Sequence, residues 1–420
     1  MFQGLSLEQA PPYKIPLKFF ITASFYLLIF SIVLLINIFE ISSRFEYETI
    51  AIVHSLTLGF FSHVMFGAMF QMIPVMLGLP YDDVEKKSNI IYFSLNIGIL
   101  FFLFGFLTTK LYLLHVSALF LGISFIYFSY ISLKTVLKSE EKDYLVLNFA
   151  TSFLLLLIGS VFGLITLIGH LGFVDSVKFG DIHISFMLFG WIFLLLNAVS
   201  YRIIPMFFVA KEFPLFIKNN LYKIIGGLLF LFFIFRINDD FESLKYIKAL
   251  LSLSVIVFAL KSIEILKNRK RARKDITVNL WYFSMINLIV ASILFIINQF
   301  LYNDISLIIG FFALFGVYSL INGMLYKIVP FLTWFHLSSS MVFDAEMNDV
   351  IKKEKMRLQI SFYHFSYICA MLGIFSKWFF VAGIISFFIS SLILIKNLID
   401  ASKYYDEYIK KKIDMGNFAS

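Results

Sequence analysis

The stretch His54–Gly78, HSLTLGFFSHVMFGAMFQMIPVMLG, decides the fold because parts of it recur twice further along the chain. On a helical wheel of about 100° per residue it divides into two faces. One face carries His54, Met65, Met69, Met72 and Met76. The opposite face carries Gly59, His63, Gly67, Phe70, Pro74 and Gly78. The first face offers nitrogen and soft sulfur ligands. The second face carries several glycines, which have no side chain and therefore let a neighbouring helix approach closely.

The composition is that of a membrane protein. Hydrophobic residues make up 60% of the 420 residues and charged residues only 15%, and the mean hydropathy is +0.88. A water-soluble domain would have about a quarter charged residues. Cys369 is the single cysteine, which excludes an intramolecular disulfide and a thiolate cluster, so a metal would have to be bound by His, Met or carboxylate side chains.

Apolar windows of about 20 residues, the length that crosses the hydrocarbon core, predict an all-α fold with about twelve transmembrane helices. Breaks as short as Lys110 and Ser376-Lys377 indicate hairpins within one transmembrane domain rather than separate domains. The predicted spans are 16–39, 51–79, 90–109, 112–133, 145–169, 182–210, 221–237, 245–266, 277–301, 305–335, 359–376 and 378–396.

The loop charges predict the orientation in the membrane. Lys and Arg gather on the side of the two termini, which predicts that both termini are cytoplasmic in a bacterial inner membrane. The basic run NRKRARKD at 268–275 fits an anchor at anionic lipid headgroups and not a nucleic-acid site. Residues 1–15 lack the pattern of a cleavable signal peptide, so the first span should stay in the mature chain. On the side of the membrane opposite to the two termini, the predicted topology places only these basic residues: Arg44, Lys110, Lys178, Arg236, Lys245, Lys248 and Lys377.

An internal repeat organises the chain. The motifs FQMIP, YRIIP and YKIVP end at Pro74, Pro205 and Pro330, about four helices apart each time. This spacing predicts three four-helix units, at about 16–133, 145–266 and 277–396, followed by a cytoplasmic tail at 397–420. Each proline should free the carbonyl four residues earlier and kink its helix; these carbonyls belong to Phe70, Tyr201 and Tyr326.

Histidines and methionines are the candidate ligands. The topology places His54, His115, His170 and His183 at the outer ends of their helices, and imidazoles at membrane depth suit haem, iron or copper. Each of them has a structural alternative, a hydrogen bond at the interface. The face formed by Met65, Met69, Met72 and Met76 suits Cu(I), with adaptable packing as its structural alternative.

Four further polar positions lie within the spans. His63, among glycines, is expected to bond to a neighbouring helix, as is Gln71. Arg202 and Lys327 follow Tyr201 and Tyr326; they could hold haem propionates or an anionic substrate, or extend to the headgroups. Acidic residues are expected mainly in loops, as at Asp82, Asp83 and Asp181, which weakens a proton-coupled transporter.

With these features the sequence resembles the haem-copper oxidase subunit I superfamily and, more loosely, the NnrS-type membrane proteins. The resemblance rests on twelve helices in a three-fold repeat, His54 followed by LTLGF, and His183 shortly before FGW. It implies that His54 is a haem ligand and that His183 takes the place of a copper ligand. The family's remaining ligands are missing, because the predicted spans 221–237 and 305–335 hold no histidine.

The sequence therefore predicts a membrane protein with an oxidase-like scaffold that is not a competent oxidase. In the first hypothesis His54 and His183 bind a b-type haem or a metal, in electron transfer, sensing or assembly linked to respiration or nitric oxide, with a respiratory or cofactor-assembly partner. The second is a transporter or copper-handling permease that uses His54 and the methionine face. The third is a structural or assembly subunit without a cofactor.

Overall fold

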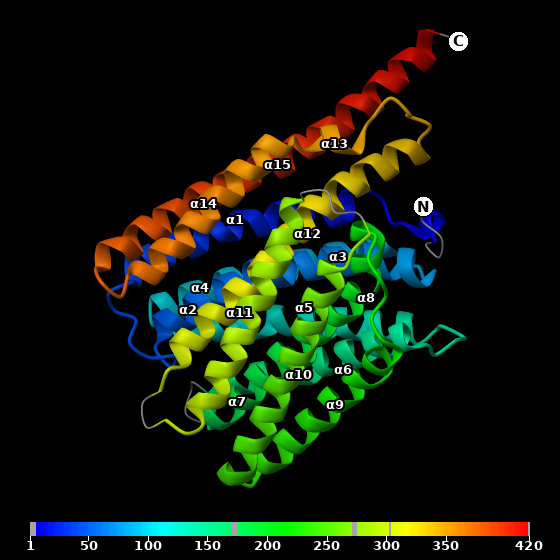
Figure 1. Cartoon of the computed structure of the whole chain (residues 1–420). Helices are drawn as coiled ribbons and strands as arrows, with labels where there is room; N and C mark the ends of the chain where they lie inside the picture. Colours follow the sequence, from blue (N-terminus) through cyan, green and yellow to red (C-terminus); the bar gives the residue numbers. More distant parts are fainter. Residues whose placement is uncertain (1–5, 170–174, 271–274, 302–303, 419–420) are drawn as a thin grey trace. The chain divides into compact units, whose positions relative to one another are not determined.

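The computed structural model describes residues 6–169, 175–270, 275–301 and 304–418, which form helices joined by loops, with no strand among them. Eleven helices of this described part are long and apolar enough to cross a membrane. Ten of these helices begin and end within about six residues of the predicted spans, and the last, Lys377–Lys412, extends 16 residues past the predicted end at residue 396. The all-α membrane architecture is therefore as the sequence predicts, and the chain has the helices of a multi-pass membrane protein (Figure 1).

The twelfth predicted span, 359–376, is the exception. Its helix α14 (Lys353–Leu372) begins with a charged turn that includes Glu354 and Arg357 and is not among the eleven span-length apolar helices of the described chain. The described residues thus form eleven helices that satisfy the length and hydropathy of a span, whereas the sequence predicts twelve.

The chain forms two compact units. Unit 1 comprises Met1–Ala10 and Met72–Leu320, and unit 2 comprises Pro11–Gln71 and Ile321–Ser420. The helices of unit 1 are α4 (Val84–Leu107), α5 (Tyr112–Val136), α6 (Tyr144–Gly169), α7 (Ser176–Ser185), α8 (Leu194–Phe208), α9 (Leu215–Ile237), α10 (Phe241–Lys267) and α11 (Ile276–Asn298), with a 3₁₀ turn at Leu7–Gln9. Unit 2 contains α1 (Lys14–Asn37), α2 (Tyr47–Leu56), α13 (Met347–Val350), α14 and α15 (Lys377–Phe418). The boundaries fall inside α3 (His63–Leu77) and α12 (Ser306–Ser339).

Small residues bring the hairpin helices close together. In unit 1 the Ser117 hydroxyl of α5 donates to the Gly98 carbonyl of α4 at 2.9 Å, and a Cβ at Gly98 would lie 2.9 Å from the backbone nitrogen of Leu121. In unit 2 a Cβ at Gly383 of α15 would lie 3.0 Å from the Ser366 carbonyl oxygen of α14. The hairpins predicted from the short breaks at Lys110 and Ser376-Lys377 are confirmed.

Aspartate side chains begin several helices of unit 1. The Asp175 carboxylate accepts the backbone N–H groups of Val177 and Lys178 at the start of α7. Asp240 accepts the backbone N–H of Ser243 at the start of α10, and Asp275 accepts that of Thr277 at the start of α11. Such caps satisfy N–H groups that have no partner within the helix, typically stabilising it by about 1 kcal/mol.

The C-terminal helix α15 runs well past one membrane thickness. Its 42 residues extend over about 63 Å at 1.5 Å per residue, about twice the hydrocarbon core. Within unit 2, Figure 1 shows α1, α14 and α15 side by side. Beyond them, Tyr405 of α15 stacks on Tyr13 at 4.1 Å between ring centroids, and the Tyr13 hydroxyl bonds to Thr333 of α12 at 2.8 Å. The segment predicted as a cytoplasmic tail thus continues the last helix.

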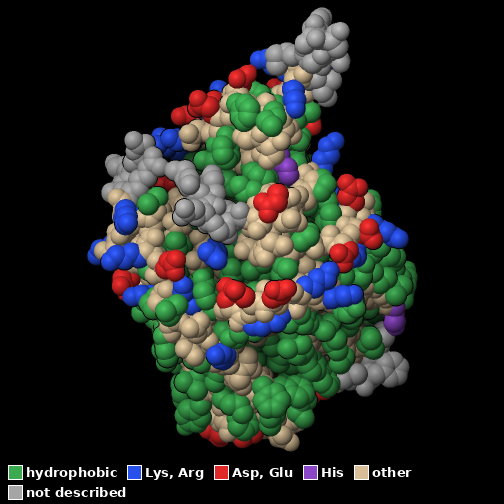
Figure 2. All heavy atoms as spheres, turned by 90° about the vertical axis from the view of Figure 1, so that its right-hand side faces the viewer, with side chains coloured by type: hydrophobic (Ala, Val, Ile, Leu, Met, Phe, Trp, Pro, Cys, Tyr) green, Lys and Arg blue, Asp and Glu red, His purple; other side chains and the backbone are tan. Residues whose placement is uncertain are grey.

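The surface has the division that a membrane protein needs. Figure 2 shows one face on which Lys, Arg, Asp and Glu side chains gather beside an extended hydrophobic surface. Large apolar side chains are exposed along the span-length helices, including Phe93, Leu119 and Phe230, each 59–62% exposed. This hydrophobic surface fits contact with a lipid bilayer.

Candidate functional site

The helices that carry His54 and His183 share an α–π–α construction. Helix α2 has 10 residues and is followed by the six-residue π segment η2 (Thr57–Ser62) and the 15-residue α3. Helix α7 also has 10 residues and is followed by the eight-residue π segment η3 (Phe186–Phe193) and the 15-residue α8. A proline is the twelfth residue of both α3 and α8. Because π segments are rare and frequent at functional sites, they single out these two helices.

His54 and His183 occupy the same place in this construction. Each is the eighth residue of its ten-residue helix and stands three residues before the π segment. In the sequence they lie 20 and 22 residues before their prolines. The difference of two residues is taken up by the π segments, which have six and eight residues.

The His183 imidazole lies in a groove that two glycines of α6 create. Its Nδ1 donates to the Gly159 carbonyl oxygen at 2.8 Å. A Cβ at Gly163, one turn further along α6, would lie 2.7 Å from both Cε1 and Nδ1 of the ring. Small residues four apart let helices approach in this way. The hydrogen bond fixes the neutral tautomer that has its lone pair on Nε2, which is how metal-bound imidazoles are commonly oriented.

The His54 imidazole is oriented by its own helix. Its Nδ1 donates to the Ile50 carbonyl oxygen, one turn earlier in α2, at 2.8 Å, and the side chain is half-buried. This bond also places the lone pair of the neutral ring on Nε2. His54 belongs to unit 2 and His183 to unit 1, so each is treated as a separate candidate ligand.

The π segment changes the face on which His54 lies. A π bulge inserts one residue and rotates the preceding helix by about 100° relative to the following one. The helical wheel that grouped His54 with the methionines was therefore wrong, because η2 lies between them. The four methionines are 1–8% exposed, as packing side chains would be; they are Met65, Met69, Met72 and Met76.

The glycine face of the same helix is confirmed as a packing face. A Cβ at Gly59 would lie 2.7 Å from Cβ of Tyr26, and one at Gly67 would lie 2.7 Å from Cβ of Phe19, both in α1. In unit 1, a Cβ at Gly190 would likewise lie 2.8 Å from Cβ of Leu155. Gly59 and Gly190, which the repeat aligns, both lie within π segments in close contact with another helix.

His63 and Gln71 are both buried, but not with the partners expected. His63 Nδ1 bonds to the Leu58 carbonyl of its own helix at 3.3 Å, five residues back as in a π turn, and its ring packs on Tyr26 of α1 at 5.1 Å. Gln71 is 3% exposed. Among the described atoms, neither its amide oxygen nor its amide nitrogen has a hydrogen-bond partner, so the bond predicted to another helix is not made there.

The tyrosines before the second and third repeat prolines have different surroundings. Tyr326 is buried, and its hydroxyl accepts a hydrogen bond from the Asn397 amide of α15 at 3.0 Å. Tyr201 is 2% exposed and packs on Phe213 at 5.1 Å. Arg202 and Lys327, which follow these tyrosines, are both half-buried.

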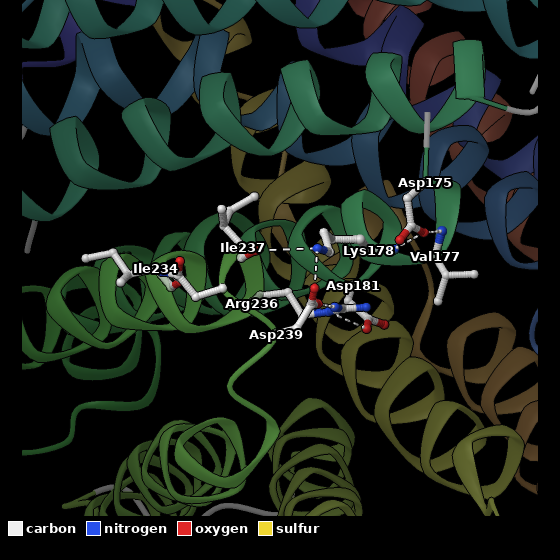
Figure 3. Close-up of polar contacts among 9 residues, drawn as sticks. Asp175, Val177, Lys178, Asp181, Ile234, Arg236, Ile237 and Asp239 are labelled. Carbon is white, nitrogen blue, oxygen red and sulfur yellow. Dashed lines mark hydrogen bonds and ion pairs between the residues drawn. The ribbon is translucent and has the colours of Figure 1, made fainter. Parts of the chain in front are cut away.

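The structure contains an ion-pair cluster near His183 that was not predicted from the sequence. Arg236 of α9 donates from Nε to Asp181 of α7 at 3.1 Å and from Nη1 to Asp239 at 2.8 Å. Lys178 of α7 donates to the other Asp239 oxygen at 2.6 Å. Figure 3 shows these side chains converging between α7 and the turn after α9. Arg236 is only 5% exposed. Asp181, expected in a loop, lies in α7, which starts at Ser176.

The cluster predicts acid sensitivity of the turn after α9. A hydrogen bond from Lys178, together with the charges of Lys178 and Arg236, lowers the pKa of Asp239. Because the folded-state pKa is depressed, this stabilisation is present above the usual carboxyl pKa of about 4 and is lost as the pH falls through the lowered value. Amide hydrogen exchange in residues 237–241 should therefore accelerate, relative to its intrinsic pH dependence, at acid pH. In Asp239→Asn, exchange in this turn should be fast at every pH; an unchanged acid response would show that another group is responsible.

The described residues contain no site at which several side chains could chelate a metal ion. No three His, Cys, Asp or Glu residues there lie close enough together to hold a metal ion. His115 is exposed and bonds to the Tyr112 carbonyl, while His170 lies outside the described residues. The predicted outer histidine cluster therefore stays a prediction.

The chain was compared with protein families and with curated proteins. No model of a protein family matches the chain, and no curated protein is significantly similar to it. The site must therefore be interpreted from its own residues, of which His183 in the α6 groove is the most sharply defined.

Proposed function

We propose that this protein is a multi-pass protein of the bacterial inner membrane that binds a b-type haem or a metal, with His183 as the first candidate ligand and His54, taken separately, as the other. Its role would be electron transfer, sensing or assembly connected with respiration or nitric oxide. It would not be an oxygen-reducing enzyme, because the sequence lacks most ligands of such a centre. Its scaffold would be the oxidase-like one that the sequence resembles.

One observation carries this proposal. The His183 ring is held across a helix interface by the Gly159 carbonyl and lies against Gly163. Carbonyl bonds of this kind commonly orient metal-bound imidazoles, and an Nδ1–H bond to a carbonyl also raises the basicity of the ligand. The matching position of His54 before its own π segment supports the same assignment.

The donor set fits a haem iron. Porphyrin supplies four nitrogen ligands, so one or two imidazoles complete the coordination. Bound haem would supply the redox or gas-binding chemistry, and the chain's residues would orient the imidazole and set its basicity. A bare copper ion would depend on the four methionines, whose burial supports packing instead.

The test is a visible absorption spectrum with iron and copper analysis of the purified full-length protein. We expect about one haem per chain in the wild type and a lost or shifted Soret band in His183→Ala. A smaller shift is expected in His54→Ala. His115→Ala is the matched control, since His115 is also at a helix end but is exposed, and its spectrum should equal that of the wild type.

Two results would reject the proposal. A folded wild type without stoichiometric haem would exclude haem binding, and stoichiometric copper in its place would favour the permease alternative. A Soret band that is unchanged in both His183→Ala and His54→Ala would exclude these ligands.

A further inference from the structure

A nearly buried lysine begins helix α9. The Lys218 side chain is 3% exposed, and its ammonium lies 4.4 Å from the centre of the Tyr144 ring. It donates to the Glu212 carboxylate at 2.8 Å. Glu212 is 70% exposed, so the lysine is buried while its counterion is accessible to water and to competing anions.

The surroundings of this pair are basic. The charges of Lys218 and Arg202 lower the pKa of Glu212, with the Lys218 hydrogen bond as the largest cause. The backbone N–H of Lys270 donates to the Val209 carbonyl at 3.0 Å, which places this further basic residue next to the loop between α8 and α9. Positive charge therefore exceeds negative charge around one exposed carboxylate.

Two hydrogen-bond donors at this place lack acceptors among the described atoms. The Tyr201 hydroxyl is buried without a hydrogen-bond partner, and so is Nε of Arg202. The Tyr201 ring packs on Phe213 of the loop and faces Tyr144 at 6.2 Å. Buried polar groups are nearly always satisfied, so unsatisfied donors beside cations indicate a missing anionic acceptor.

The loop lies where a headgroup would lie. Residues 209–214 join α8 and α9, each part of a span-length apolar helix, so the loop lies at a membrane boundary. Leu215 and Phe216 are 65% and 71% exposed and offer apolar contact to acyl chains. Basic pockets between transmembrane helices are recurrent sites for anionic headgroups.

We propose that the α8–α9 loop forms a binding site for the phosphate headgroup of an anionic lipid. Arg202 and Lys218 contact the phosphate, the Tyr201 hydroxyl donates to it, and Glu212 is the chain's own competing anion. The site involves neither His183 nor His54, so it can be tested apart from haem binding.

The experiment measures lipid binding to the full-length protein in nanodiscs of phosphatidylcholine that contain increasing phosphatidylglycerol. We expect Lys218→Met and Arg202→Gln each to weaken phosphatidylglycerol binding by about fivefold or more, at about one charge contact each. Glu212→Gln should strengthen it, because the competing carboxylate is removed. Lys223→Gln, an exposed lysine of the same helix, is the matched control and should have little effect.

The sign of the Glu212→Gln effect separates the proposal from a structural ion pair. Weaker binding in Glu212→Gln, or an equal loss in Lys223→Gln, would overturn the proposal. A parallel titration with inorganic phosphate, in nanodiscs of phosphatidylcholine alone, separates the two sources of phosphate. We expect no saturable binding there; saturable binding of free phosphate that depends on Lys218 would overturn the lipid assignment.

Discussion

Replacing Gly163 with alanine is expected to destabilise the protein by about 1–3 kcal/mol and to displace the His183 imidazole. The added Cβ would lie 2.7 Å from two ring atoms that the Gly159 carbonyl holds in place. Either the ring turns out of its hydrogen bond or α6 and α7 move apart. The free energy of unfolding in mixed micelles measures the first effect, and the visible spectrum of the bound haem measures the second.

The chain offers a matched control for this substitution. Gly227 lies inside α9, and a Cβ there would meet nothing within 4 Å. Gly227→Ala should be neutral or should stabilise the helix by up to about 1 kcal/mol, since alanine is the better helix former. Equal effects of the two substitutions would show that the groove around His183 is not tightly packed.

Replacing Arg236 with methionine is expected to cost about 2–3 kcal/mol of the free energy of unfolding. Arg236 is 5% exposed and binds both Asp181 and Asp239. Removing it leaves the Asp181 carboxylate, 19% exposed, without its cation, and the typical penalty of 3–5 kcal/mol for a broken buried pair is reduced here because Asp239 is accessible to water and retains Lys178. Thermal and chemical unfolding of the full chain would measure this loss.

The double substitution tests the assigned cause. If an unpaired carboxylate is responsible, Arg236→Met combined with Asp181→Asn should be less destabilised than the sum of the single effects. Lys245→Met serves as the control, because its pair with Glu242 is a surface pair with side chains 34% and 78% exposed and should contribute less than about 1 kcal/mol. Additive effects would contradict this explanation.

Helix positions were predictable because the bilayer sets a length. Runs of about 20 apolar residues have few alternatives to a membrane helix, and the predicted span 112–133 differs from α5 by three residues at one end. Helix α14 was harder to assign because its charged first turn precedes an apolar part that is too short to qualify. The three-fold repeat stays a prediction, although α2–α3 and α7–α8 share one construction.

The π segments could not be predicted, because no residue pattern encodes them and their formation depends on packing. The Gly59 and Gly190 contacts within them are tertiary. A signal was nevertheless present. The two-residue difference between His54 and His183 in distance to their prolines equals the difference in π-segment length. On a uniform helix of about 100° per residue, the same difference would place the two histidines about 200° apart around the helix axis.

The ion-pair cluster was missed for another reason. From the sequence, Lys178 and Arg236 are expected to be loop charges that report orientation, and Asp181 is expected in a loop. Pairing them requires the knowledge that α7 begins at Ser176 and lies beside the end of α9. The order of the chain alone does not supply that contact, since 55 residues separate Asp181 from Arg236.

The most direct test of the central claim, that His183 is a haem ligand, is the optical spectrum of His183→Gly with and without added imidazole. Glycine leaves space for a free imidazole in the α6 groove while removing the covalent ligand. We predict that the Soret band of the wild type is lost or shifted in His183→Gly and is restored when imidazole is added. The claim would be contradicted if the folded His183→Gly protein, measured before any imidazole is added, had the same spectrum as the wild type.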